Sequence, residues 1–180
     1  EISGVTDYKA KDDADALDKI KSIMNKVGDF DKAGFNRIPS KKPKSNPNDI
    51  FGLLPKSRAD QYDMYEIIKR LVDNSEIEEY KADYGKTIIT AYARIDGWSV
   101  GIIANQRKLV KSANKEMQFG GVIYNDSADK ATRFIANCNQ KKIPLVFLQD
   151  VTGFMVGSKS EHSGIIKDGA KMVNALSNSV

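Results

Sequence analysis

The stretch that decides the fold of this 180-residue chain runs from Ile143 to Asp168, IPLVFLQDVTGFMVGSKSEHSGIIKD. Its apolar run, Leu145 to Leu148, is typical of a strand that is buried on both faces of a parallel sheet. The glycine-rich segment from Asp150 to Gly164 predicts a loop at the carboxyl end of that strand. Loops in this position often form the ligand sites of α/β proteins, although tight turns alone would also explain the glycines. A helix is expected to follow, from about Gly164 to Ser177, and its spacing predicts a buried face of Ile165, Ile166, Ala170, Met172, Val173 and Leu176.

The composition is that of an ordinary soluble globular chain, with 41% hydrophobic and 29% charged residues. No apolar run approaches the roughly 20 residues that cross a bilayer, so no membrane partner is expected. The N-terminal residues lack the apolar segment of a signal peptide, and the single cysteine, Cys138, excludes an internal disulfide. These observations predict a reducing, cytoplasmic location.

The net charge of +4 comes largely from one stretch, Arg37 to Lys44 (RIPSKKPK), which prolines interrupt. This stretch is predicted to be a mobile linker. Elsewhere lysines alternate with carboxylates, as on a solvated face, and no basic stripe is interleaved with aromatic residues. A nucleic-acid partner is therefore not expected, whereas a modest positive excess would suit a phosphate-bearing cofactor such as coenzyme A.

The clearest local signal is a β-hairpin. Lys86 to Ile95 is rich in β-formers, Asp96-Gly97 fits a two-residue type I′ turn, and Trp98 to Ala104 is the return strand. A helix capped by Ser127 is expected over Ala128 to about Lys141, before the strand described above. The order strand, strand, helix, strand, helix indicates an α/β fold. No strand is expected after the last helix, so the sheet should end at an exposed edge, which suggests a fragment.

Two amphipathic helices are expected before the hairpin. Asp12 and Asp13 provide an N-cap for the first, which should end at Gly28 and cover a surface with Ala16, Leu17, Ile20, Met24 and Val27. Asp60 or Ser57 is expected to cap the second, with a buried stripe of Met64, Ile67, Ile68, Leu71 and Val72. Between them lies a proline-rich, irregular connector in which Ile50, Phe51, Leu53 and Leu54 are apolar enough to dock on a neighbour.

Few residues carry catalytic chemistry, and none belongs to a motif. His162, the only histidine, has no acid–base partner at motif spacing and is expected to contact solvent or substrate rather than act as a base. Cys138 lies on an apolar helix face, which favours a core residue over a nucleophile. Asp150 is expected to orient the loop or to cap a turn. No cluster has metal-ligand spacing, so no metal site is predicted.

The chemistry that remains requires few side chains. Backbone N–H groups of glycine-rich loops can stabilise an enolate when they line a dry apolar pocket. Gly153, Phe154, Gly157, Gly164 and the Gly120-Gly121 pair are the right kinds of residue for such a pocket.

Several motifs together resemble a known family. GIIANQ (101–106), the stretch from QFGG to FMVG (118–157) and GIIKDGAKMVNA (164–175) resemble the carboxyltransferase (β) subunit of biotin-dependent acyl-CoA carboxylases. VTGFMVG and QFGGVIY resemble the methylcrotonoyl-CoA carboxylase type, because the propionyl-CoA type more usually has prolines where Thr152 and Val156 stand. SGVTDYKAKDDADAL (3–17) and DIFGLLP (49–55) resemble the connection between the two halves of such a subunit.

This resemblance implies a crotonase-like (ClpP/crotonase) fold, a ββα superhelix of which the chain holds part. Residues 1–56 would be the interdomain helix and linker, and residues 57–180 the N-terminal portion of a truncated C-terminal, biotin-side carboxyltransferase domain. The related N-terminal domain would hold the acyl-CoA, and the active site would lie at a dimer interface. The implied partners are a biotin carboxylase and biotin carrier subunit and further copies of the subunit, commonly in a dimer-built hexamer.

The resemblance also implies roles for individual residues. Gly153 and Phe154 fall in the loop that shapes the biotin pocket, Gly157, Gly164 and Ile165 continue the same wall, and Gly120 and Gly121 are possible pocket glycines. The implied cofactor is biotin on a carrier domain, and the implied substrate is a CoA thioester. No residue is assigned as a catalytic group.

The implied reaction is the transfer of CO2 from carboxybiotin to a methylcrotonoyl-CoA-like thioester. A later glycine loop of the family is not in this sequence, and therefore the chain alone is predicted to be inactive. Two alternatives stay open. The chain could belong to the carboxyltransferase subunit of a glutaconyl-CoA-type decarboxylase, which runs the transfer in reverse, or to a non-catalytic crotonase-fold assembly domain.

Overall fold

The computed structural model describes residues 4–27, 36–57 and 60–179. Its centre is a four-stranded sheet in the order β1-β2-β3-β7. The first three strands are antiparallel neighbours, and β3 and β7 are parallel. The bounds of these strands are Ile77–Glu79 (β1), Ile88–Ile95 (β2), Trp98–Asn105 (β3) and Leu145–Leu148 (β7).

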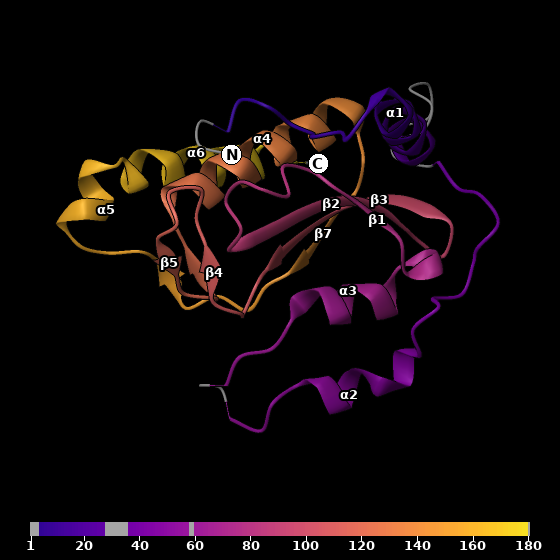
Figure 1. Ribbon diagram of the computed structural model, residues 1–180, viewed down its shortest axis with the longest axis horizontal. Helices are drawn as coiled ribbons and strands as arrows, with labels where there is room; N and C mark the ends of the chain where they lie inside the picture. The colour runs from indigo at the N-terminus through magenta and orange to yellow at the C-terminus, as the bar shows by residue number, and fades with distance from the viewer. Residues whose placement is uncertain (1–3, 28–35, 58–59, 180) are drawn as a thin grey trace.

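Helices cover both faces of this sheet. Figure 1 shows α4 (Asn125–Lys141) and α6 (Ile165–Ser177) above the sheet, and α3 (Met64–Leu71) and α2 (Ile50–Leu53) below it. The helix α1 (Asp13–Val27) lies near one end of the upper layer. The remaining short elements are η1 (Pro47–Asp49), η2 (Asp73–Ser75), β4 (Val110–Lys111), β5 (Met117–Gln118), β6 (Val122–Ile123), β8 (Gly153–Phe154) and α5 (Ser158–His162).

The predicted hairpin is confirmed. Ile95 pairs with Trp98 across the turn, and Asp96 and Gly97 have φ angles of 50° and 79°. Positive φ at both central residues is the signature of a type I′ turn, whose twist matches that of the flanking strands. A side chain at Gly97 would also overlap the carbonyl of Ile38, so this position needs glycine for two reasons.

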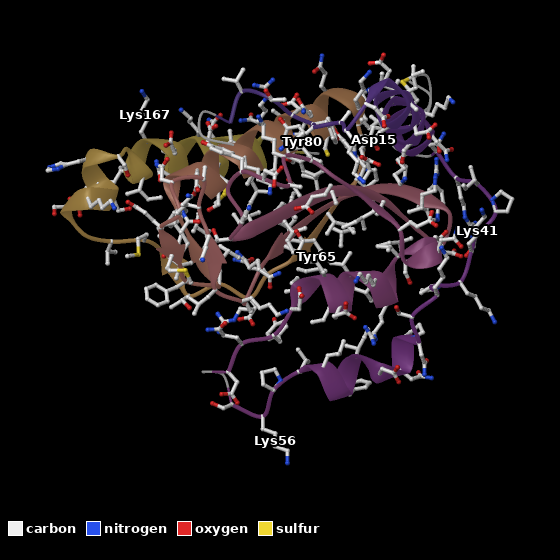
Figure 2. All side chains as sticks on the ribbon, in the orientation of Figure 1. Asp15, Lys41, Lys56, Tyr65, Tyr80 and Lys167 are labelled. Carbon is white, nitrogen blue, oxygen red and sulfur yellow. The ribbon has the colours of Figure 1, made fainter. Side chains whose placement is uncertain are left out.

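The stretch from Arg37 to Lys44 is anchored to the hairpin, and the prediction of a mobile linker is wrong. The Ile38 N–H donates to the Gly97 carbonyl at 3.1 Å, and the Lys41 N–H donates to the Asp73 carboxylate at 3.2 Å. The side chain of Lys41 extends outward from this segment (Figure 2). The acceptors lie more than 30 residues further along the chain, so no local pattern could indicate them.

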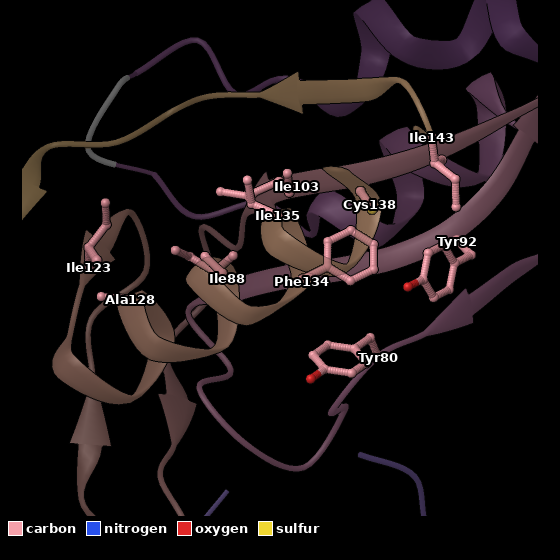
Figure 3. Packing of buried hydrophobic residues seen from close by; sticks show 11 residues of the cluster. Tyr80, Ile88, Tyr92, Ile103, Ile123, Ala128, Phe134, Ile135, Cys138 and Ile143 are labelled. Atoms are coloured by element: carbon pink, nitrogen blue, oxygen red, sulfur yellow. The ribbon is translucent and has the colours of Figure 1, made fainter. Parts of the chain in front are cut away.

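The first core lies between α4 and the sheet. Phe134 is fully buried, with ring centroids 5.5 Å from Tyr80 and 4.9 Å from Tyr92 (Figure 3). The face that the sequence predicted for this helix is confirmed, since Ala131, Ile135 and Cys138 are buried as well. The predicted cap is wrong. Tyr124 is the N-cap, and Ser127 stands in the first turn, where its hydroxyl accepts a bond from the Tyr124 N–H at 2.9 Å.

The second core lies on the opposite face, where α3 packs on the sheet. Met64, Ile68 and Val72 are buried against apolar residues of β2 and β3, while Ile67 and Leu71 are only partly buried. The N-cap is Asp63, whose carboxylate accepts a bond from the Tyr65 N–H at 3.1 Å. The expected caps Asp60 and Ser57 are therefore wrong, because Asp63 directly precedes the first helical residue.

A buried polar contact connects the two layers. Lys130 of α4 is fully buried, and its Nζ lies 3.8 Å from a carboxylate oxygen of Glu79 on β1. The same carboxylate accepts a bond at 2.8 Å from the hydroxyl of Tyr65, on the α3 side of the sheet. In Figure 2, Tyr65 lies below the sheet and Tyr80 above it. Burial lowers the pKa of Lys130 to about 8 and raises the pKa of Glu79.

The first helix has the predicted cap but not the predicted packing. The Asp12 carboxylate accepts a bond from the Asp15 N–H at 2.8 Å. However, Leu17, Ile20 and Met24 are 56–67% exposed, so the expectation that this stripe covers a surface is wrong for the described residues. The helix instead contacts the first core through Val27. The expected stop at Gly28 lies outside the described residues.

Two other apolar expectations hold only in part or fail. Ile50 and Leu53 are half-buried where α2 contacts α3, whereas Phe51 and Leu54 are 87% and 46% exposed. Phe147 of β7 is 40% exposed, so the prediction of a strand buried on both faces is wrong. Among the described strands, β7 has β3 on one side only and forms the expected sheet edge.

Candidate functional site

The segment that leaves β7 is tied to the chain that precedes α4. Gly153 and Phe154 form the short strand β8, which pairs in parallel with β6. Two further backbone bonds extend this pairing, from the Thr152 N–H to the Gly121 carbonyl at 2.7 Å and from the Met155 N–H to the Ile123 carbonyl at 2.8 Å. The sequence predicted a plain loop here, because a two-residue strand leaves no periodic pattern.

An open apolar groove of about 360 Å³ lies between this segment and α6. Phe154 lies at its side with 41% of its surface exposed. The ring lies against α6 where Gly169 leaves room, since a Cβ at Gly169 would be 2.9 Å from the ring. The lining residues are Phe154, Met155, Val156, Glu161, Ile165, Ile166, Gly169, Ala170 and Val173.

The groove exists because α6 is only partly covered. Ile165 is buried as predicted, and Met172 contacts the first core. Ile166, Val173 and Leu176 were expected to be buried, but they are 74%, 59% and 44% exposed. The helix packs beside α4 rather than flat on the sheet, and this leaves one apolar side of α6 open (Figure 1).

The structure brings some of the predicted site residues together. Phe154 and Ile165 both line the groove, and Gly153 directly precedes Phe154 in β8. Gly157 and Gly164 do not line it. They are the N-caps of α5 and α6, so they set the directions in which the two helices leave the segment.

The Gly120-Gly121 pair has a different neighbour. A side chain at Gly120 would overlap the backbone carbonyl of Arg107, and one at Gly121 would overlap its guanidinium group. Gly121 also has a φ of 72°, which favours glycine. The pair therefore makes room for Arg107 and lies apart from the groove-lining residues.

Arg107 reaches the start of the segment after β7. Its Nε lies 3.4 Å from a carboxylate oxygen of Asp150, which also accepts a bond at 2.7 Å from the hydroxyl of Tyr62. Burial and this hydrogen bond raise the pKa of Tyr62 to about 12. These contacts fit the expectation that Asp150 orients the loop. Sequence reasoning missed Arg107, Tyr62 and Gly169, although the paired glycines were a signal that another group approaches closely.

The two reactive side chains of the sequence lie elsewhere. Cys138 is buried in the first core, where burial raises the pKa of its thiol to about 12, and its prediction as a core residue is confirmed. His162 is exposed at the end of α5. Among the described residues, no three His, Cys, Asp or Glu side chains are grouped closely enough to hold a metal ion. None of the described helices is long and apolar enough to cross a membrane.

Comparisons with known proteins all indicate one family. The family model described as the carboxyl transferase domain matches residues 1–180. The chain is 42% identical over 97% of its length to a biotin-dependent 3-methylcrotonyl-coenzyme A carboxylase beta1 subunit of Mycobacterium tuberculosis. It is 35% identical over 98% of its length to a methylmalonyl-CoA decarboxylase subunit alpha of Veillonella parvula.

A solved structure shows the same fold. The transcarboxylase 12S hexamer, determined with methylmalonyl-coenzyme A and methylmalonic acid bound, superposes with a TM-score of 0.84 over 99% of this chain at 33% identity. The crotonase-like architecture expected from the motifs is thereby confirmed. The chain spans 30% of the Mycobacterium tuberculosis relative, 33% of the Veillonella parvula relative and 33% of the transcarboxylase chain.

Proposed function

This chain belongs to the carboxyl transferase domain family, and from that membership we propose that it is part of the carboxyltransferase subunit of a biotin-dependent acyl-CoA carboxylase. The proposed reaction moves a carboxyl group from carboxybiotin to a methylcrotonoyl-CoA-like thioester. The observation that carries the proposal is the open apolar groove beside Phe154, which the β6–β8 pairing holds against α6. The name of the Mycobacterium tuberculosis relative supports this choice of acyl group.

Within that subunit, residues 57–180 form the start of the biotin-side domain, and residues 1–56 form the interdomain helix and linker. Two features support this division. The sheet and both cores lie within residues 57–180, apart from contacts of Tyr8 and Val27. The stripe of α1 is exposed, as expected for a helix that connects two bodies.

The groove residues suit the biotin ring system, which has apolar faces and one polar ureido edge. Phe154, Ile165 and Val173 offer apolar contacts, and a groove of about 360 Å³ is large enough for a group of this size. The N-cap of α6 has no side-chain hydrogen bond, so the first N–H groups of the helix can donate to a ureido oxygen. Bound carboxybiotin supplies the carboxyl group that is transferred.

The chain's own residues have three tasks in this proposal. The β6–β8 pairing fixes the height of Phe154 above α6. The apolar lining provides one wall of the groove, and a surface that closes the open side would complete the exclusion of water, which strengthens hydrogen bonds made inside. The first turn of α6 provides backbone donors that need no reorganisation, because the helix holds them in place.

The proposed partners are a biotin carboxylase and biotin carrier subunit and further copies of the subunit in a dimer-built hexamer. The exposed apolar side of α6 supports an assembly, since apolar patches of this kind usually mark interfaces or ligand sites. The similar transcarboxylase 12S protein assembles as a hexamer, which also supports it. A cytoplasmic location is part of the proposal, and subcellular fractionation would test it.

A test uses the full-length subunit with its biotin donor. Replacing Phe154 with Ala should raise the KM for the donor by about tenfold and leave the KM for the acyl-CoA within about twofold. The reason is that the biotin ring system loses its contact with the Phe154 ring. Phe51→Ala is a matched control, since Phe51 is exposed on α2, away from the groove. Absence of any transfer from carboxybiotin by the wild-type subunit would contradict the proposed function.

The 180-residue chain by itself should show no turnover with carboxybiotin and acyl-CoA. It spans about a third of its relatives, and one side of the groove is open to solvent. Turnover by the isolated chain would overturn this expectation.

A second candidate is a biotin-dependent decarboxylase of the glutaconyl-CoA type, in which carboxyl transfer runs from the CoA thioester to biotin. The Veillonella parvula relative, named as a decarboxylase subunit, specifically supports it. Incubating the full-length subunit with biotin and a labelled carboxylated CoA thioester separates the two by their preferred direction. Transfer in neither direction would leave the non-catalytic assembly domain as the remaining alternative.

A further inference from the structure

We propose that Arg107 is a positioning residue for the segment that leaves β7, and that it fixes where Gly153 and Phe154 stand. This inference rests on the proposed function, because it assigns the control of the biotin groove to a residue outside it. The physical basis is a guanidinium group that fits beside Gly121 and reaches the first carboxylate after β7.

The Arg107 side chain lies in a closely fitted space beside the Gly120-Gly121 pair. Arg107 follows the end of β3, and its side chain is only 15% exposed. Gly121 leaves room for its guanidinium group and Gly120 leaves room for the Arg107 backbone, since a Cβ at either position would overlap these atoms. The guanidinium group therefore has a defined place beside Gly121.

From this space the Arg107 side chain reaches Asp150. Parallel strands β3 and β7 end at the same edge of the sheet, so Arg107 and Asp150 emerge as neighbours. The Arg107 Nε lies 3.4 Å from Asp150, and Tyr62 holds the same carboxylate oxygen at 2.7 Å. Asp150 is about half exposed, so the ion pair alone contributes little stability. Its effect is to orient the chain that leaves β7.

Backbone hydrogen bonds connect this contact to Phe154. Gly121 donates its N–H to the Gln106 carbonyl at 2.8 Å and accepts a bond from the Thr152 N–H at 2.7 Å. The residue that encloses Arg107 thus also holds the residue before β8. Arg107 therefore acts on the groove at two points, through Asp150 at the start of the segment and through Gly121 at Thr152.

The test compares Arg107→Met with Lys108→Met in the full-length subunit. Lys108 is a neighbouring cation whose side chain bonds to Asp63, a residue outside the segment after β7. For Arg107→Met we expect the KM for the biotin donor to rise by about tenfold, with the KM for the acyl-CoA within about twofold, because small misplacements of binding groups are costly. We expect Lys108→Met to leave both values near those of the wild type.

Hydrogen exchange of residues 149–157 gives a second readout that does not depend on activity. Exchange there should become faster in Arg107→Met and stay unchanged in Lys108→Met, since the segment loses one of its anchors.

Should Arg107→Met not fold, Asp150→Asn takes its place, because it removes the charge of the partner and keeps an acceptor for Tyr62. A wild-type subunit without transfer activity would overturn the proposed function, and exchange would then decide the role of Arg107. An active wild type with an unchanged donor KM in the variant would overturn the positioning role itself.

Discussion

The helices α4 and α6 lie side by side and both carry an apolar stripe, but their surroundings differ. Phe134 and Cys138 of α4 are fully buried against the sheet, whereas Ile166 and Val173 of α6 are 74% and 59% exposed. α4 contacts the sheet directly, and α6 contacts mainly α4. The comparison shows that an amphipathic pattern identifies an apolar face of a helix without identifying the surface that covers it.

The difference also separates two roles. The face of α4 holds the first core together and places β6, through which the segment after β7 is attached. The open face of α6 is one wall of the candidate site. Substitutions on α4 should therefore change the stability of the chain, and substitutions on α6 should change what the groove binds.

The largest effect is expected for Phe134→Ala, which should lower the free energy of unfolding by about 3–5 kcal/mol. The ring fills the space between Tyr80 and Tyr92, and the cavity left behind cannot collapse around two other rings. Urea denaturation of the 180-residue chain measures this loss. A loss below about 1 kcal/mol, in the range of surface positions, would break the comparison.

The next effect concerns Lys130, the one charged residue on the buried face of α4. Its pKa in the folded chain is about 8, below the value of about 10.4 in an unfolded chain. Between these values the unfolded chain binds the proton more tightly, so unfolding becomes less favourable as the pH rises. The unfolding free energy of the wild type should therefore rise relative to that of Lys130→Met, by up to about 1 kcal/mol per pH unit from pH 8 to about 10.4.

Denaturation at several pH values, with Lys171→Met as a control on the exposed side of α6, measures this difference. Lys171 is paired with Asp168 at the surface and should give no comparable slope in the same direction. If the unfolding free energy of the wild type instead fell relative to that of Lys130→Met over this pH range, the pKa of Lys130 would be raised in the folded chain and the prediction would be wrong.

A smaller effect is expected for Gly169→Ala on α6. Alanine in a helix is favoured over glycine by up to about 1 kcal/mol, but here its Cβ would be 2.9 Å from the Phe154 ring, which must move. Gly52→Ala on α2 is the matched control, because a Cβ there would meet nothing within 4 Å. Thermal denaturation should show a gain for Gly52→Ala and less or none for Gly169→Ala. Equal gains would mean that Phe154 does not depend on the space at Gly169.

The smallest effect is expected for Val173→Ser on the open side of α6. Since this side chain is 59% exposed, the unfolding free energy of the 180-residue chain should change by no more than about 0.5 kcal/mol. Urea denaturation beside Phe134→Ala gives the measurement. A loss of several kcal/mol would show that the face is covered in the isolated chain and would remove the contrast between the two helices.

Several features could be predicted from the sequence because their causes are local. Asp96-Gly97 specifies the hairpin turn by its tolerance of positive φ, and the apolar spacing from Ala131 to Cys138 specifies the buried face of α4. The motifs around VTGFMVG identified the family and, through it, the crotonase-like fold. Phe154 and Ile165 were named from the sequence, and both line the groove.

Other features could not be predicted, because their causes lie far apart in the chain. Whether Leu17 or Ile166 is covered depends on which element packs against its helix, and periodicity carries no information about that. Arg107 and Asp150 meet because β3 and β7 end at the same edge of the sheet, and Tyr62 reaches Asp150 from the segment before α3. The segment from Arg37 to Lys44 is anchored by Asp73 and by the hairpin turn, which are distant in sequence.

The sequence by itself thus determined the hairpin, the four longest helices and the family, since turn residues and helical spacing act over a few residues. Only the tertiary structure decided that Ile143 to Asp168 includes a second short strand, paired with β6, and that α6 leaves one apolar side open to a groove. The reason is that burial and close approach are properties of pairs of segments. A glycine such as Gly121 shows that something approaches it, but only the fold shows that the approaching group is Arg107.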